Sequence, residues 1–208
     1  MKSFTLIIVA LLLVTTRTSL AQNIYLEAAA LSANIENGKQ VYRLCAACHL
    51  ANGLGKPNGS FPVIASQHSS VIIQQLDDIQ NKYRDNPTMY PFSDSETIGG
   101  TQSIADVAAY IQSLKSNSNN GKGSGQDLDR GKDLYLNNCV ECHGEAGEGD
   151  RALKYPRIKH QHYAYLLRQL QWIRDGYRIN ANQTMLMRIK NMSDEQLSRV
   201  ADYVSRIK

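Results

Sequence analysis

Two copies of the pentapeptide Cys-x-x-Cys-His contain every cysteine of the chain. Two thiols three residues apart can each add to one vinyl group of a porphyrin, and the adjacent histidine can then bind the iron from one side. The sequence therefore predicts two covalently attached c-type haems, with two cysteines and one axial histidine for each. The first set is Cys45, Cys48 and His49, and the second is Cys139, Cys142 and His143.

Zinc is the main alternative for these cysteines, because Cys-x-x-Cys is also half of many structural zinc sites, which bring two such halves together. Here 94 residues separate the two halves, each half has its own histidine, and no further cysteine remains. Haem attachment is therefore favoured over zinc or a plain disulfide.

The first 21 residues have the pattern of a signal peptide. Lys2 precedes an apolar run at 6–14, and Ser19-Leu20-Ala21 then offers small residues at the positions that signal peptidase reads. Nine apolar residues are too few for a membrane span, which needs roughly 20. We predict cleavage after Ala21 and a periplasmic protein, where covalent haem attachment of this kind takes place. Arg17 is unusual so close to a cleavage site, which leaves an uncleaved anchor as the alternative.

Charge does not indicate a nucleic-acid partner. Without residues 1–21 the chain has 21 basic and 19 acidic residues, a net charge of +2. Residues 22–115 have 6 basic and 8 acidic residues, and residues 127–208 have 14 and 11. The opposite signs of −2 and +3 fit either plainly solvated surfaces or a dipole that steers partners.

The chain is an internal duplication with an offset of 94 residues, which slips to 93 near the ends. We expect a signal peptide at 1–21, one domain at 22–115, a second at 127–208, and between them a polar, glycine-rich, flexible connector at 116–126 with nothing to bury. Besides the haem motifs, the repeated positions are Gly53/Gly147, Gly55/Gly149, Pro62/Pro156, Gln67-His68/Gln161-His162, Gln75-Leu76/Gln169-Leu170 and Tyr83-Arg84/Tyr177-Arg178.

The apolar spacing in each half predicts an all-α fold. Short amphipathic turns lead into the cysteines, and no segment alternates as a strand would. Ser193 with Gln196 forms a capping box for the last helix. A middle helix has the stripe Ile72, Leu76, Ile79, Tyr83, repeated as Leu166, Leu170, Ile173, Tyr177, and a closing helix has Ile104, Val107, Ala108, Ile111, Leu114, repeated as Leu197, Val200, Ala201, Val204, Ile207.

Methionine is the first candidate for the sixth ligand of each iron. Met89 and Met185 both follow a threonine in what we expect to be the loop before the closing helix, and Met187 competes with Met185. A thioether ligand raises the reduction potential relative to two imidazoles. The rival ligands are His68 and His162, although both open the middle helix, where a cap or a surface position explains them equally well.

Two further pairs of residues could support the haems. Pro62 and Pro156 each follow the haem histidine by 13 residues, so that a backbone carbonyl there could accept the ring N–H. A rigid turn explains these prolines as well. Arg84 and Arg178 could bind haem propionates, since guanidinium pairs with carboxylate through two parallel hydrogen bonds.

The duplicated pattern resembles the dihaem cytochrome c4 family over nearly the whole mature sequence. Its parts are, in order, Gly-Lys-x-x-Tyr, Cys-x-x-Cys-His, Gly-x-Gly, Pro, Gln-Leu, Tyr-Arg, Met and Ala-x-Tyr. This resemblance implies two tandem class I cytochrome c domains whose haems face each other across a domain interface. It also implies Met89 and Met185 as the sixth ligands. One departure is the longer first loop, which places Met89 21 residues before Tyr110, whereas Met185 precedes Tyr203 by 18.

The resemblance implies an electron carrier rather than an enzyme, which passes single electrons between redox protein partners of a respiratory chain. A dedicated electron-accepting subunit of a periplasmic sulfide or thiosulfate dehydrogenase is the alternative, and peripheral association with a membrane stays open. A dihaem peroxidase is disfavoured, because it needs an iron with an open position.

Overall fold

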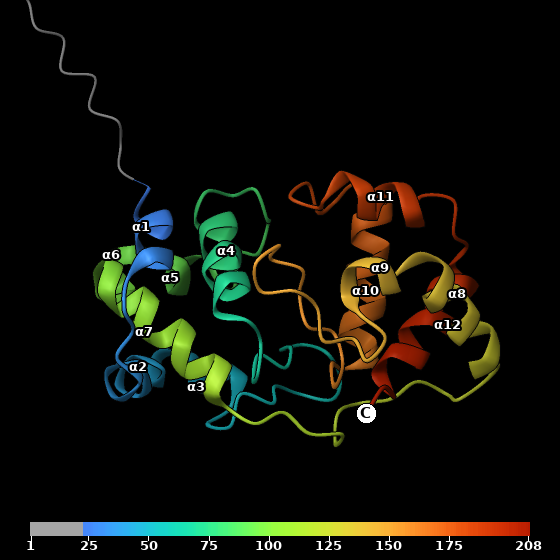
Figure 1. Ribbon diagram of the computed structural model, residues 1–208, viewed down its shortest axis with the longest axis horizontal. Helices are drawn as coiled ribbons and strands as arrows, with labels where there is room; N and C mark the ends of the chain where they lie inside the picture. The colour runs from blue at the N-terminus through green and yellow to red at the C-terminus, as the bar shows by residue number, and fades with distance from the viewer. Residues whose placement is uncertain (1–22) are drawn as a thin grey trace, which may run out of the picture.

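The computed structural model describes residues 23–208, so the predicted signal peptide and its cleavage after Ala21 lie outside the described part. The fold is all-α, as predicted, and within the described range the only β-type pairing is an isolated bridge between Asp150 and Tyr155. Two helical lobes stand side by side in Figure 1. The first contains α1 (Ile24–Ala30), α2 (Ile35–Val41), α3 (Arg43–His49), α4 (Ser69–Gln80), α5 (Tyr90–Ser93), α6 (Ser95–Ile98) and α7 (Gly100–Ser113), and the second contains α8 (Leu128–Asn138), α9 (Val140–His143), α10 (Tyr163–Arg174), α11 (Gln183–Ile189) and α12 (Asp194–Ser205).

Each lobe repeats one arrangement, with α2–α3, α4 and α7 corresponding to α8–α9, α10 and α12. The closing helix packs across the helix that leads into the Cys-x-x-Cys-His motif, α7 on α2 and α12 on α8. Glycine makes both crossings close: a Cβ atom on Gly38 would lie 2.1 Å from the carbonyl oxygen of Asp106, and one on Gly131 would lie 2.4 Å from that of Arg199. Each lobe has its own apolar core around this crossing, which includes Ile104 in the first lobe and Leu197 in the second.

This close approach leads to a stability prediction. The substitution Gly38→Ala should destabilise the first lobe by about 1–3 kcal/mol, because the added methyl group overpacks the α2–α7 contact. Gln40→Ala, on the exposed side of the same helix, is the control and should have little effect. Thermal unfolding of the haem-loaded protein checks this, and equal stability of the two variants would contradict it.

The closing helix agrees with the sequence except at its end, because α7 ends at Ser113 and α12 at Ser205, before the predicted positions Leu114 and Ile207. The middle helix is also shorter than predicted. Ser193 and Gln196 form the predicted capping box at the start of α12. The prediction that the middle helices reach Tyr83 and Tyr177 is wrong, because α4 ends at Gln80 and α10 at Arg174. Soon after each end a residue takes left-handed backbone angles that stop a helix, Lys82 at φ 60° and Gly176 at φ 79°.

Helix α1 has no counterpart in the second lobe and was not predicted. The Asn23 side chain caps it by accepting hydrogen bonds from two backbone amides. The hydroxyl of buried Tyr25 donates to the carbonyl of Ser93, which attaches α1 to α5. Seven residues give too short a periodic pattern for α1 to stand out in the sequence.

The segment between the lobes runs along the bottom of Figure 1 without forming a helix. The expectation that it is flexible with nothing to bury needs correction at Asn120. The side-chain amide of Asn120 is buried and donates to the carbonyls of Gln161 and Ser205. Further along, the backbone amides of Gly123 and Gly125 donate to the carboxylate of Asp202. Hydrogen bonds therefore hold this connector against the second lobe.

No helix in the described part of the chain is both long and apolar enough to cross a membrane.

Candidate functional site

Both Cys-x-x-Cys-His motifs lie at helix ends that bury the histidine. His49 is the last residue of α3 and His143 the last of α9, and both side chains are buried. The next residue leaves helical geometry in each case, Leu50 at φ 65° and Gly144 at φ 76°. The helix thus presents the two thiols and then turns the chain away directly after the imidazole.

A proline carbonyl orients each of these imidazoles. The Nδ1 atom of His49 lies 3.1 Å from the carbonyl oxygen of Pro62, and that of His143 lies 3.0 Å from the carbonyl oxygen of Pro156. Burial lowers the pKa of both imidazoles, which keeps them neutral. A neutral ring that donates from Nδ1 carries its lone pair on Nε2, which is the atom needed to bind iron. The predicted carbonyl contact is therefore present in both lobes.

The cysteines do not form the zinc site considered from the sequence. All four are free thiols, and the two pairs belong to different lobes. In residues 23–208 no three metal-binding side chains gather in one place. Burial raises the pKa of Cys45 to about 11 and that of Cys139 to about 12.

The methionines occupy different surroundings in the two lobes. Met89 is half-buried directly before α5. Met185 lies within α11 rather than in a loop, which corrects the prediction, and it packs against the core of the second lobe. Met187 is 61% exposed, whereas Met192 is buried in the core as expected. Of the two competing sulfurs, that of Met185 is the one directed toward the protein interior.

His68 and His162 serve the contact between the lobes. The Nε2 atom of His68 lies 2.8 Å from the carbonyl oxygen of Glu148, and that of His162 lies 2.8 Å from the carbonyl oxygen of Leu54. His162 is fully buried, and its Nδ1 atom also accepts a hydrogen bond from the amide of Gly121. Both histidines stand at the N-cap position of their helix, as expected, but neither side chain caps the helix, and His162 does not lie at the surface. With both nitrogens of His162 occupied, the geometry does not support bis-histidine ligation.

Gln67 and Gln161, which directly precede these two histidines in the sequence, form a second pair of contacts between the lobes. The side-chain amide of Gln67 accepts from the backbone N–H of Arg157 and donates to its carbonyl, at 2.9 Å each. Gln161 makes the same two bonds with the backbone of Val63, at 2.9 and 2.8 Å. Val63 and Arg157 are themselves related by the 94-residue offset. The lobes therefore meet through equivalent surfaces, as in a two-fold symmetric dimer.

Arg84 and Arg178 meet at the centre of this contact, each of them donating to both Gln75 and Gln169 at 2.6–3.1 Å. Arg84 also donates to the hydroxyl of Tyr165 at 2.6 Å. Burial and the charge of Arg84 lower the pKa of Arg178 to about 9. Among residues 23–208 neither guanidinium forms an ion pair with a carboxylate, so the structure leaves the predicted pairing of both arginines with haem propionates as a prediction.

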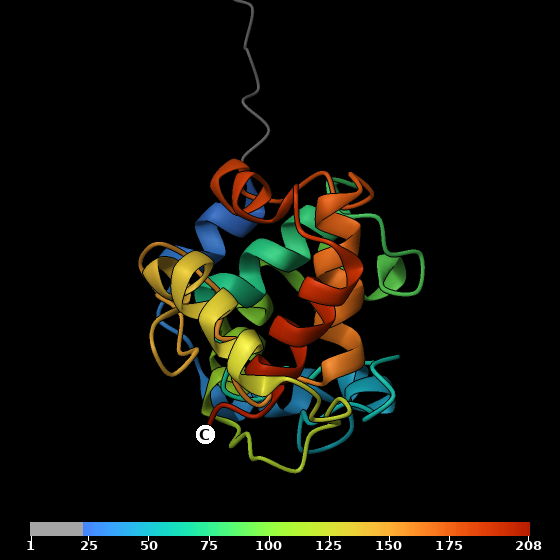
Figure 2. The ribbon, with the colours of Figure 1, turned by 90° about the vertical axis from the view of Figure 1, so that its right-hand side faces the viewer.

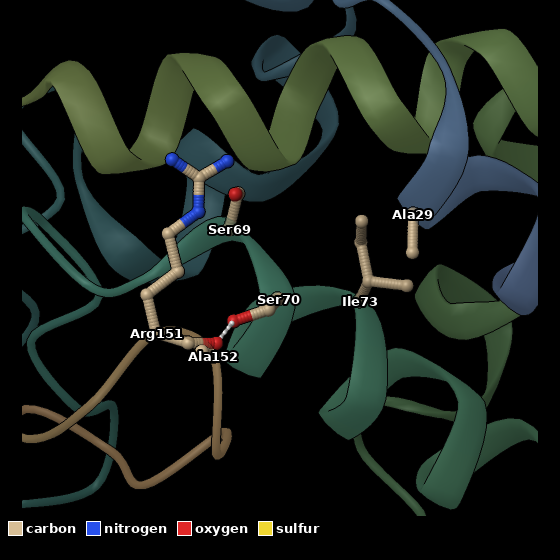
Figure 3. A pocket seen from close by; sticks show the side chains of 6 residues that line it. All are labelled: Ala29, Ser69, Ser70, Ile73, Arg151 and Ala152. Atoms are coloured by element: carbon tan, nitrogen blue, oxygen red, sulfur yellow. Dashed lines mark hydrogen bonds between the residues drawn. The ribbon is translucent and has the colours of Figure 1, made fainter.

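A separate shallow pocket lies where α1 and α4 face a loop of the second lobe (Figure 3). Ala29 and Ile73 line one side, and on the other the Ser70 hydroxyl donates to the carbonyl of Arg151 at 2.7 Å. The pocket contains no cysteine, histidine or methionine. It is therefore distinct from the two motif sites.

Comparison with known proteins gives this arrangement a family. The profile of the cytochrome c family matches residues 35–115 and again residues 128–208. Cytochrome c4 from Azotobacter vinelandii is 31% identical over 77% of this chain and 83% of its own length. The chain belongs to the cytochrome c4 family. The crystal structure of reduced recombinant cytochrome c4 from Pseudomonas stutzeri superposes with a TM-score of 0.75 at 26% identity, covering 85% of this chain and all of that one.

Membership of the cytochrome c4 family gives the chain two covalently bound c-type haems, at Cys45/Cys48 and at Cys139/Cys142, and the function of electron transfer. The similarity also extends to a protein from Stutzerimonas stutzeri described as a thiosulfate dehydrogenase electron acceptor. It is 31% identical over 78% of each chain.

Sequence reasoning missed Tyr165 in this cytochrome c4 chain. The corresponding residue of the first lobe, 94 positions earlier, is Val71, so the repeat gave no signal for it. Gln67, His68, Gln161 and His162 were recognised as repeated residues, but their partners across the interface were not.

Proposed function

We propose that this protein is an electron carrier in which each iron is held between a histidine and a methionine. His49 and Met89 would bind the first iron, and His143 and Met185 the second. The two buried imidazoles, each oriented by a proline carbonyl, are the observation that carries this proposal. When bound, the haems supply a one-electron Fe(III)/Fe(II) couple.

The residues of the chain then act by holding the haem ligands, the haem propionates and the two lobes in place. The carbonyls of Pro62 and Pro156 fix the ring orientation, so that oxidation and reduction proceed with little rearrangement of the ligands. Arg84 and Arg178 would bind the propionates and neutralise their charge at the contact between the lobes. The paired contacts of Gln67 and Gln161 keep the lobes in one orientation, which fixes the distance an electron has to cross.

Carbon monoxide tests whether the chain is a carrier rather than an enzyme. With sulfur and nitrogen on both irons, the reduced protein should keep its visible spectrum when carbon monoxide is added, because no iron position is open. A spectrum that changes to that of a carbonyl complex, or sustained consumption of hydrogen peroxide, would contradict the proposal.

We further propose that the mature protein begins at Gln22 and acts in the periplasm. The charged and apolar pattern of residues 1–21 supports export, and so does covalent haem attachment. N-terminal sequencing of the purified protein tests the cleavage after Ala21.

The alternative is a dedicated acceptor for a thiosulfate or sulfide dehydrogenase. The similarity to a thiosulfate dehydrogenase electron acceptor favours this possibility. Co-purification with a catalytic subunit from the native organism would support the alternative, and a monodisperse protein that exchanges electrons with several partners would support a free shuttle.

A further inference from the structure

The residue that follows each motif histidine has backbone angles that suit only glycine. In the second lobe this residue is Gly144, at φ 76° and ψ 165°, whereas in the first lobe it is Leu50, at φ 65° and ψ 160°. Residues other than glycine hardly ever adopt these angles, because their side chain collides with the backbone, and such strain persists only where the surroundings impose it. The first lobe therefore holds strained backbone directly beside its histidine, and the second lobe does not.

Burial of the leucine does not explain this strain. The Leu50 side chain is 39% exposed, so it gains little from packing. Its backbone carbonyl, in contrast, accepts two hydrogen bonds, one from the hydroxyl of Tyr42 at 2.8 Å and one from the amide of Gly53 at 3.1 Å. Tyr42 is buried between α2 and α3, and its ring packs against that of Tyr110 with the centroids 5.2 Å apart. A buried and well-packed donor therefore fixes the Leu50 carbonyl.

The same carbonyl is connected to the contact that orients His49. Gly53 donates to the Leu50 carbonyl, and its own carbonyl accepts a hydrogen bond from the amide of Ile64 at 2.8 Å. Ile64 lies two residues after Pro62, whose carbonyl oxygen is 3.1 Å from the Nδ1 atom of His49. A continuous series of hydrogen bonds and short backbone segments thus runs from the tyrosine hydroxyl to the imidazole.

The second lobe contains the same series of contacts without the strain. Figure 2 shows this lobe facing the viewer, with α8 leading into α9. The hydroxyl of buried Tyr135 in α8 donates to the carbonyl of Gly144, and the amide of Gly147 also donates to it at 3.3 Å. The Gly147 carbonyl accepts from the amide of Ile158 at 2.8 Å, and Ile158 lies two residues after Pro156. Because glycine adopts the required angles freely, this lobe is a natural control for the first.

We propose that Tyr42 is a positioning residue for the axial histidine of the first lobe. Its hydroxyl holds the strained turn at Leu50, and this turn keeps the Pro62 carbonyl in place against the imidazole. The inference rests on the proposed function, in which His49 binds the iron. A hydrogen bond from the ring N–H strengthens donation from the imidazole to the metal. Without the hydroxyl the turn relaxes toward angles that leucine prefers, and the imidazole loses part of this hydrogen bond. Tyr135 has the same place in the second lobe but holds no strained residue.

The experiment compares tyrosine-to-phenylalanine variants of the full-length protein with both haems. In the reduced protein, nuclear magnetic resonance measures how fast the ring N–H proton of His49 exchanges with solvent. Tyr42→Phe should accelerate this exchange by about tenfold, the effect of losing one buried hydrogen bond. It should also raise the midpoint potential of the first haem, because a less electron-rich imidazole stabilises Fe(III) less. Tyr135→Phe should accelerate exchange of the corresponding proton of His143 by no more than about threefold.

Two further variants separate positioning from packing. Tyr110→Phe changes the other ring of the pair, whose hydroxyl makes no hydrogen bond within residues 23–208, so exchange and potential should stay at their wild-type values. Leu50→Gly removes the strain, and in the Tyr42→Phe background it should restore both the slow exchange and the potential. A merely structural role of Tyr42 predicts no such rescue, since Leu50→Gly adds no contact.

The outcomes distinguish this inference from the proposed function. A wild-type protein in which His49 does not bind iron would overturn the proposed function itself. With that ligand confirmed, the positioning role alone is overturned if Tyr42→Phe has no effect, if Tyr135→Phe has an equal one, or if the glycine variant gives no rescue. Should Tyr42→Phe fail to assemble with haem, Leu50→Gly alone decides. Higher thermal stability than the wild type supports the strained turn that Tyr42 holds, and equal or lower stability overturns it.

Discussion

Met185→Leu should lower the midpoint potential of one haem by on the order of 0.1 V or more, a fraction of the roughly 0.8 V over which axial ligands tune haem potentials. The thioether of Met185 faces the core of the second lobe, and leucine has no atom that can bind iron. The oxidised variant should also lose about half of the long-wavelength absorption that arises from sulfur-to-iron charge transfer. Spectroelectrochemistry resolves both effects.

The control for this experiment is Met187→Leu, two residues away in the same helix. Because the Met187 side chain is 61% exposed, its replacement should change neither the potential nor the spectrum. If Met187→Leu produced the loss and Met185→Leu did not, the ligand assignment of the second lobe would be wrong. A loss in neither variant would contradict methionine ligation there altogether.

Replacing Cys139 and Cys142 together by serine should leave only one covalently bound haem on the chain. Serine cannot form the thioether, and the two thiols are the only ones in the second lobe. A unit of this size has a small core, so the lobe should also become less stable when its porphyrin is no longer tied in. Intact-mass analysis of the denatured protein counts the remaining haem.

The matched control is the same double substitution at Cys45 and Cys48 in the first lobe. Each double variant should lose one haem and keep the other, because the two motifs lie in separate lobes. Two covalent haems in either variant would contradict thioether attachment at these cysteines. Loss of both haems from one variant would show instead that the lobes depend on each other for haem attachment.

Sequence reasoning worked where the signal is local. The haem motifs, the apolar stripe of the closing helix and the capping box at Ser193 are all set by residues within a few turns of one another. The contact between each histidine and its proline carbonyl was also predictable, because the same spacing of 13 residues appears twice. The spacing between histidine and proline would be weak evidence in one half alone, but because of the duplication it is found in both halves.

The contact between the lobes could not be predicted in the same way. The sequence marks Gln67, His68, Gln161 and His162 as repeated, but their partners are backbone atoms 80 or more residues away. The connector was misjudged for the same reason, since Asn120 is buried by groups from distant parts of the second lobe. The ends of the middle helices depended on left-handed residues that the apolar period does not reveal.

The duplicated positions that changed are as informative as those that stayed. Four repeated pairs join the lobes from both halves: Gln67/Gln161, His68/His162, Gln75/Gln169 and Arg84/Arg178. Tyr165 and Trp172, in contrast, have the counterparts Val71 and Asp78. The longer methionine segment of the first lobe likewise folds as α5 and α6, where the second has α11. The interface therefore kept its symmetry while the methionine-side surfaces diverged.

A coulometric redox titration of the purified full-length protein tests the central claim most directly. If both lobes hold haem iron that cycles between Fe(III) and Fe(II), each chain takes up two electrons and returns both when it is reoxidised, with the same spectrum before and after. Uptake of one electron or none per chain, or a cycle that does not return the starting spectrum, would contradict a dihaem electron carrier.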